Sequence, residues 1–207
     1  MIASILANTA QIVAGTTVRW VGCAPTEEQR IYIANHSSHL DFIVLWSYLP
    51  PWLRRRTRPV AARDYWERDV IRRYLAARVF NVVLIDRTAI PGTAPGQAGR
   101  LAVDRMVEAL SDQHSLILFP EGTRGGGEDL AAFRSGLFHL CRAKPEVEVV
   151  PVYLENLNRI LPKGHLLPVP MLSRITFGTP LRLRPDETKD AFLERARLSV
   201  EALKGAA

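Results

Sequence analysis

Residues 31–41 read IYIANHSSHLD, an apolar segment that runs into a polar turn and then into the start of a helix. Ile31–Ala34 is rich in β-branched side chains and favours a buried strand. Ser37 or Ser38 suits the N-cap of the helix that follows, which we expect over Leu40–Tyr48. A strand that gives way to a helix in this manner is the basic unit of an α/β fold.

The same alternation continues along the chain. Further apolar runs typical of buried strands occur at Pro59–Ala62, Val82–Ile85, Leu116–Phe119, Val147–Leu154 and Ile175–Phe177. Further stretches with helical spacing occur at Tyr65–Phe80, Gly96–Leu110, Ala131–Ala143 and Glu187–Leu203. The sequence therefore predicts the α/β class, as a single-domain sandwich whose mostly parallel mixed sheet is flanked by helices.

Residues 1–24 are expected to form an N-terminal amphipathic helix that associates with a membrane, ahead of a folded domain over residues 25–207. No charged residue occurs before Arg19. Apolar residues of this segment follow helical spacing, at Ile2, Ile5, Leu6, Ile12 and Val13. Polar side chains dilute the segment and no basic region precedes it, so we expect neither a membrane span nor a secretory signal.

The formal net charge of +6 favours an anionic partner, which can be a phosphate ligand, an anionic lipid or a nucleic acid. Arginines and aromatic side chains are interleaved between residues 46 and 78, a combination that suits the bilayer interface. No zinc-finger, RNA-binding or zipper pattern accompanies them, so nucleic acid is not an expected partner. Cys23 and Cys141 lie far apart in sequence, which favours a reducing cytoplasm over a disulfide framework.

His36 follows the first predicted strand directly, at the position where open α/β sheets hold ligands. If Asp41 lies in the first helical turn, its carboxylate can fold back onto one imidazole nitrogen and leave the other free to accept a proton from an alcohol. Two alternatives stay open. Asp41 can complete a capping box with Ser38, and His36, His39 and Asp41 can ligate a metal, although their spacing differs from H-E-x-x-H.

Three more strand ends carry residues of interest. Phe119-Pro120-Glu121-Gly122-Thr123-Arg124 follows an apolar run. Its arginine can hold a phosphate and Glu121 can accept from a hydroxyl, or the two can form a structural salt bridge. Asp86-Arg87 ends a second run. Pro151 lies inside a third, which predicts an edge strand or a bulge that shapes a pocket wall.

In this order, the four segments resemble the glycerolipid acyltransferase family that includes 1-acylglycerol-3-phosphate acyltransferases. That family is marked by an N-H-x-x-x-x-D box, a strand that ends in I-D-R, an F-P-E-G-T-R box and a V-P-V strand. The match spans about residues 35–153. Phe133-Arg134-Ser135-Gly136 stands where the family often has F-K-x-G. Gly125, Arg134 and Asn81 differ from the usual residues, near the boxes that hold the acceptor.

The resemblance implies that residues 25–207 form an acyltransferase domain in which His36 is the general base and Asp41 orients it. It implies that Pro151 helps to shape the acyl-donor site. It also implies an acceptor-phosphate site made of Arg87, Glu121, Gly122, Thr123 and Arg124. A backbone N–H near His36 or Gly122 is expected to stabilise the oxyanion.

The implied reaction moves a fatty acyl group from an acyl-CoA or acyl-carrier-protein thioester to a hydroxyl of a lysophospholipid such as 1-acylglycerol-3-phosphate. No metal and no cofactor are expected, and the expected location is the cytoplasmic face of the membrane, where the protein is peripheral or weakly anchored. The alternatives are an acyltransferase of the same fold with a different lipid or alcohol acceptor, a basic membrane-binding or nucleic-acid-binding module without catalysis, and a metal-dependent hydrolase.

Overall fold

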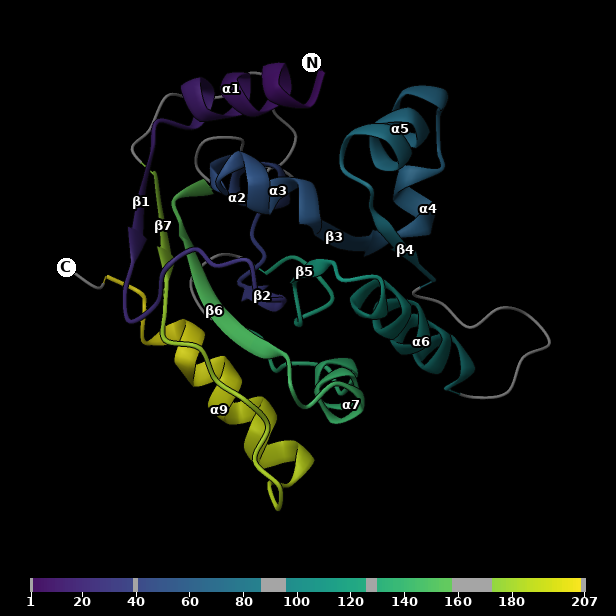
Figure 1. The fold of residues 1–207 in the computed structure, drawn as a ribbon, viewed down its shortest axis with the longest axis vertical. Coiled ribbons are helices and arrows are strands. Elements are labelled where there is room, and N and C mark those ends of the chain that lie inside the picture. The colour runs from purple at the N-terminus through teal and green to yellow at the C-terminus, as the bar shows by residue number, and fades with distance from the viewer. Residues whose placement is uncertain (1, 39–40, 87–95, 126–129, 158–172, 206–207) are drawn as a thin grey trace.

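The computed structural model describes residues 2–38, 41–86, 96–125, 130–157 and 173–205 (Figure 1). Strands in these ranges form one seven-stranded sheet in the order β1-β7-β6-β2-β5-β3-β4. All neighbouring strands are parallel except β6 and β7, which run antiparallel. The strands are β1 (Thr16–Trp20), β2 (Arg30–Ala34), β3 (Thr57–Ala62), β4 (Val83–Ile85), β5 (Ser115–Leu118), β6 (Glu148–Glu155) and β7 (Ser173–Phe177).

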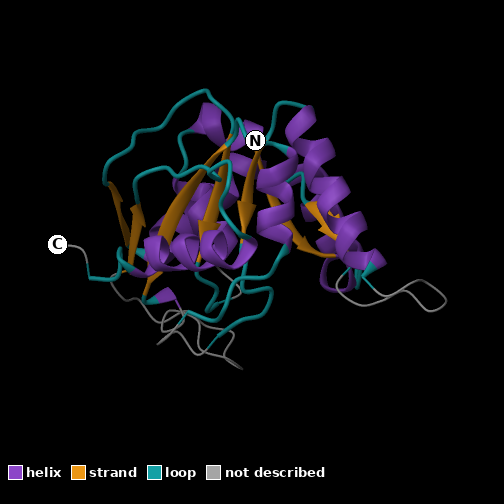
Figure 2. Ribbon diagram, turned by 90° about the horizontal axis from the view of Figure 1, so that it is seen from below, coloured by secondary structure: helices purple, strands orange, loops and turns teal. Residues whose placement is uncertain are grey.

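Helices lie on both faces of the sheet (Figure 2). Side chains alternate along a strand, so Ile31 and Ile33 of β2 join one core whereas Tyr32 and Ala34 join the other. The first core also contains residues of α6 (Gln97–Ser111), α7 (Gly136–Ala143) and α9 (Lys189–Glu201). The second contains residues of α1 (Ile2–Ala14), α2 (Asp41–Tyr48) and α3 (Pro51–Arg56). The predicted α/β sandwich with a mostly parallel mixed sheet is confirmed.

The N-terminal helix is present, but it ends well before residue 24. α1 ends at Ala14 because Gly15 has a φ of 50°, in the left-handed region that ends helices. The β-branched side chains that follow suit a strand, and residues 16–20 form β1, which pairs with β7 at the edge of the sheet. The N-terminal segment is therefore partly built into the sheet.

α1 packs on the domain through one side and exposes isoleucines on the other. Ala7 and Ala14 are buried and Leu6 packs against the core, whereas Ile2, Ile5 and Ile12 are exposed. Part of the apolar surface of this helix is therefore open to solvent. Within the described ranges, none of the helices combines the length and the apolar character that crossing a bilayer requires.

The helix predicted over Tyr65–Phe80 is broken into three pieces. These pieces are α4 (Arg63–Trp66), α5 (Val70–Tyr74) and the π-helical turn η1 (Leu75–Val79). The break lies before Asp69, whose side chain accepts from the backbone N–H of Arg72 and so caps a new helix start. The helical spacing of apolar residues continues through the cap at Asp69, so this spacing alone predicted one helix.

Two other helices match the prediction and one begins late. α6 and α9 lie within two residues of the ranges expected from spacing. α7 begins at Gly136 and not at Ala131, because residues before it are held as a loop: the N–H of Ala131 bonds to Glu121 and the N–H of Arg134 bonds to the carbonyl of Pro120. Most of the loop predicted over Thr88–Gly99 lies outside the described residues.

Pro151 lies in an interior strand, and the expectation of an edge is wrong. β6 is paired on one side with β2 and on the other with β7. The carbonyl of Pro151 accepts from the N–H of Gly178. The backbone nitrogen of Pro151, which has no hydrogen to donate, points to the same side of the strand as this carbonyl. The regular pairing with β7 begins only at Val152, so the missing N–H falls where this ladder is interrupted.

Candidate active site

His36 and Asp41 meet at the carboxyl end of β2. The Nδ1 atom of His36 lies 2.9 Å from Oδ2 of Asp41, and the same oxygen accepts from the backbone N–H groups of Ser37 at 2.6 Å and Ser38 at 2.8 Å. The Asp41 side chain is fully buried, whereas the His36 side chain is 24% exposed. Asp41 therefore binds the backbone at the helix start and the imidazole at once, so the contacts expected from both interpretations are present in the structure.

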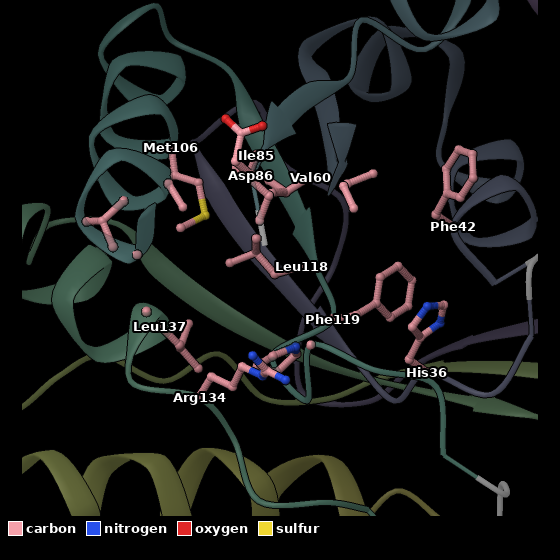
Figure 3. A pocket seen from close by; sticks show the side chains of 18 of the residues that line it. His36, Phe42, Val60, Ile85, Asp86, Met106, Leu118, Phe119, Arg134 and Leu137 are labelled. Atoms are coloured by element: carbon pink, nitrogen blue, oxygen red, sulfur yellow. The ribbon is translucent and has the colours of Figure 1, made fainter. Parts of the chain in front are cut away.

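The contacts of the imidazole define which nitrogen is free. An ionised carboxylate only accepts hydrogen bonds, so contact with Asp41 favours the tautomer that carries its proton on Nδ1. The ring of His36 stacks on the ring of Phe119 with 4.4 Å between centroids. These two contacts fix the ring, and in the neutral imidazole they favour Nε2 as the nitrogen that can accept a proton. His36 also lines the main cavity (Figure 3).

This cavity has a volume of about 420 Å³ and a mostly apolar interior. In Figure 3, apolar side chains stand between Asp86 and the His36–Arg134 side of the cavity. They come from three strands and two helices, and include Val60, Ile85, Met106, Leu118 and Leu137. Such a lining suits a hydrocarbon chain, while the polar groups at its ends can orient a ligand.

Glu121 lies beside His36 but does not line this cavity. Its Oε1 accepts from the backbone N–H of His36 at 2.8 Å, and its Oε2 accepts from the N–H of Ala131 at 3.0 Å. The residue is only 4% exposed. Both carboxylate oxygens are thus engaged with the backbone, so the side chain holds the histidine loop against the loop that precedes α7.

Two arginines line the cavity on the side of His36. One is the predicted Arg124, which is exposed. The other is Arg134, whose Nε donates to the carbonyl of Glu121 at 3.1 Å. Within the described ranges no carboxylate pairs with Arg134. Its guanidinium is therefore anchored at one nitrogen and can bind an anion with the others.

Gly122 makes room for Arg134. It has a φ of 72°, and a Cβ built on it would come within 3 Å of three atoms of the Arg134 side chain. Any larger residue at position 122 would be strained and would displace the guanidinium group. The sequence pattern indicated Arg134 only as a departure from F-K-x-G, because the direction of its side chain depends on the turn after β5.

Four backbone N–H groups near the site are already hydrogen-bonded. The N–H of His36 bonds to Glu121, and that of Gly122 bonds to the carbonyl of Phe119 at 3.0 Å. The N–H groups of Ser37 and Ser38 bond to Asp41. A backbone oxyanion donor near His36 or Gly122 therefore stays a prediction, and these four groups are not free to serve as it in this conformation.

Two other predicted site residues, Thr123 and Pro151, are not brought to the cavity. Thr123 is exposed and does not line it, and Pro151 contacts Gly178 within the sheet. Arg87 and His39 lie outside the described residues. In the part of the chain that the structure describes, no group of three His, Cys, Asp or Glu side chains is arranged to hold a metal ion.

A charged network forms the far end of the cavity. Asp86 lines the cavity and accepts from Nε of Arg63 at 3.0 Å, and Arg105 lies 3.8 Å from its other oxygen. Arg63 also pairs with Glu67 at 2.6 Å. The partners of Asp86 tie β4 to α4 and α6, so this carboxylate supports the cavity wall.

Comparisons with known proteins identify acyltransferases among the relatives of this chain. The chain is 28% identical over 161 residues to a 1-acyl-sn-glycerol-3-phosphate acyltransferase of Limnanthes alba, a match that covers 76% of this chain and 52% of the relative. It is 27% identical over 133 residues to the human 1-acyl-sn-glycerol-3-phosphate acyltransferase alpha, which covers 64% of this chain and 42% of the relative. The chain spans about half the length of the first of these relatives.

The fold is also shared with a solved structure. The crystal structure of the 1-acyl-sn-glycerophosphate (LPA) acyltransferase PlsC from Thermotoga maritima aligns with a TM-score of 0.73 at 18% identity, covering 98% of this chain and 77% of that one. The model of the family described as Acyltransferase matches residues 17–155, a range that contains His36, Asp41, Glu121 and both cavity arginines. The chain belongs to the Acyltransferase family.

Proposed function

We propose that this protein transfers a fatty acyl group from a thioester to a hydroxyl of a lysophospholipid such as 1-acylglycerol-3-phosphate. The observation that carries the proposal is the contact between His36 and the buried Asp41 at the mouth of an apolar cavity that is also lined by two arginines. An apolar cavity suits an acyl chain, and guanidinium groups suit a phosphate. The names of the similar proteins support the same acceptor class.

In the proposed reaction, Nε2 of His36 removes the proton of the acceptor hydroxyl while that oxygen attacks the thioester carbonyl carbon. The carbon–sulfur bond breaks, and the thiolate leaves and takes up the proton from the imidazolium. Asp41 keeps Nδ1 protonated and stabilises the imidazolium that forms between the two steps. No metal and no cofactor are needed in this sequence of steps.

Arg124 and Arg134 bind the acceptor phosphate in this proposal, together with Arg87 from the family motif. In the same proposal, Glu121 holds the His36 backbone and does not contact the acceptor, because both of its carboxylate oxygens accept from backbone N–H groups. The donor is acyl-CoA or an acyl-carrier protein. The protein acts at the cytoplasmic face of a membrane as a peripheral protein, since its acceptor and product are membrane lipids.

The proposal is tested by acyl transfer with the purified chain. Acyl-CoA and acyl-carrier-protein donors are compared directly with 1-acylglycerol-3-phosphate as the acceptor. We expect turnover with this acceptor, and weak turnover with monoacylglycerol, which lacks the phosphate. His36→Ala, assayed at matched concentration, controls for contaminating activity. Thioester hydrolysis without transfer, or equal rates with and without the acceptor phosphate, would contradict the proposed function.

A further inference from the structure

The segment after α4 exposes large apolar side chains to solvent. Val70 is 70% exposed, Ile71 is 72% exposed and Tyr74 is 47% exposed. Positions 70, 71 and 74 have the spacing that places side chains on one face of a helix. The opposite side of the same segment is anchored in the domain, because Ala76 and Phe80 are buried. The burial of Ala76 and Phe80 therefore anchors the segment but leaves the face with Val70, Ile71 and Tyr74 uncovered.

Exposed arginines surround this face. Arg68, Arg73 and Arg78 are exposed, and within the described ranges none of them forms an ion pair. Arg72 differs, since it pairs with Asp69 and lies over the ring of Tyr65. The segment thus combines uncovered apolar side chains with cations that lack an internal partner. We call the group of Arg68, Val70, Ile71, Arg73, Tyr74 and Arg78 the α5 surface.

The α5 surface adjoins the wall of the main cavity. Tyr65 and Trp66 precede it in α4 and line the cavity, as does Phe42 of α2. The ring of Trp66 packs edge-on against that of Phe42 at 5.5 Å, and Phe80 at the end of the segment packs against both. In Figure 1, α4 and α5 stand beyond the β3–β4 edge of the sheet. If α5 contacts another surface, the cavity therefore lies close to that surface.

We propose that the α5 surface docks on an anionic phospholipid bilayer, with Val70, Ile71 and Tyr74 inserted at the interface and the arginines on lipid phosphates. Apolar side chains flanked by cations are the combination that interfacial helices use, and tyrosine favours the interface because its ring is apolar and its hydroxyl polar. The choice of a lipid surface rests on the proposed function, in which the acceptor enters from the bilayer.

A comparison with α1 favours α5 as the contact that selects anionic lipid. α1 also exposes isoleucines, but no charged residue occurs within Ile2–Ala14. Apolar insertion by α1 would be insensitive to lipid charge, whereas docking through the α5 surface requires negative lipid and weakens with salt. The two contacts are therefore separable by lipid composition.

The test is co-sedimentation of the full chain with vesicles of phosphatidylcholine alone or of phosphatidylcholine with phosphatidylglycerol. We expect the double variant Val70→Ser/Ile71→Ser to bind the mixed vesicles at least about tenfold more weakly, since apolar burial drives insertion. Arg68→Gln/Arg73→Gln should remove the preference for the mixed vesicles. Leu198→Ser, at a leucine of α9 that is 49% exposed, is the matched control and should bind as the wild type does.

Unchanged vesicle binding by both double variants, or an equal loss in Leu198→Ser, would overturn the proposal. It would also be overturned if the double variants bound vesicles normally but lost transfer from acyl-carrier protein alone, since the surface would then serve that acidic partner. Circular dichroism of each variant excludes unfolding. Because vesicle binding is read without turnover, failure of this proposal is distinguishable from failure of the proposed acyl transfer.

Discussion

Two loops of this protein follow neighbouring parallel strands, and each carries an ionisable residue of a family box. His36 follows β2 and Glu121 follows β5. The imidazole of His36 is held on one side by Asp41 and faces the main cavity on the other. The carboxylate of Glu121 is buried, and both of its oxygens accept from backbone N–H groups. Only the histidine retains a free polar atom for a ligand.

This difference shows that position at a strand end does not by itself make a residue a substrate contact. A side chain at such an end can face the cavity, or it can supply the hydrogen bonds that a buried loop backbone requires. Glu121 does the second, and it does so for the residue whose geometry matters most. In the proposed mechanism, the first box presents the base, and the second box holds the backbone of that base in place.

Replacement of His36, which faces the cavity, should have the largest effect on catalysis. We expect His36→Ala to lower kcat by about 10²–10⁴-fold, because the general base is lost. The melting temperature should change little, since the histidine is a partly exposed loop residue. Steady-state kinetics and thermal unfolding of the same preparation check both statements. A variant that retains more than a tenth of the wild-type kcat would remove His36 from the chemistry.

Loss of the Arg134 guanidinium should weaken binding of the acceptor and leave the general base unaffected. We expect Arg134→Ala to raise the acceptor KM by about 10–100-fold, the equivalent of charge-assisted hydrogen bonds worth roughly 1.5–3 kcal/mol. The donor KM should stay the same. Gly122→Ala should copy part of this effect, because its Cβ would displace Arg134. If Arg134→Ala changed the donor KM and not the acceptor KM, the phosphate would have to bind elsewhere.

The smallest effect on kcat/KM for the acceptor is expected from replacement of Glu121, which binds backbone N–H groups. In Glu121→Gln, the amide oxygen can still accept from one N–H group, but the amide nitrogen cannot accept from the other. We therefore expect stability to fall by about 1–3 kcal/mol. We also expect kcat to fall by about tenfold with the acceptor KM unchanged, because a misplaced base slows the chemical step. Denaturant unfolding and steady-state kinetics measure these changes.

The acceptor KM of Glu121→Gln decides whether Glu121 binds only backbone N–H groups, in contrast to His36. A rise as large as that of Arg134→Ala would mean that Glu121 contacts the acceptor after all. Glu108→Gln, at a charged position of α6, provides a control for loss of a carboxylate away from the site.

The sequence was sufficient for features that depend on neighbouring residues. The apolar run at Ile31–Ala34 and the polar turn after it predicted β2 and the start of α2, because burial and capping are local properties. β1 was missed, since residues 16–20 are only half-buried and pair with a strand more than 150 residues away. The break before Asp69 was missed because helical periodicity continues through it.

The same distinction applies to the site. Contact between His36 and Asp41 was predictable, because five residues of chain bring the two side chains within reach. The role of Glu121 was not, since its partner at Ala131 lies on a loop whose path is set by tertiary packing. For the same reason, the pattern around residue 134 indicated a cation but not that its side chain lines the cavity.

The proposed mechanism depends most on the tautomer of the neutral His36 imidazole, and ¹⁵N NMR of histidine-labelled protein tests it directly. We expect the neutral ring to carry its proton on Nδ1 and not on Nε2 in the His36 signal, which is assigned by its absence in His36→Ala, and we expect a mixture of tautomers in Asp41→Asn. A neutral ring with its proton on Nε2 in the wild-type protein, or a His36 signal that Asp41→Asn leaves unchanged, would contradict the proposed mechanism.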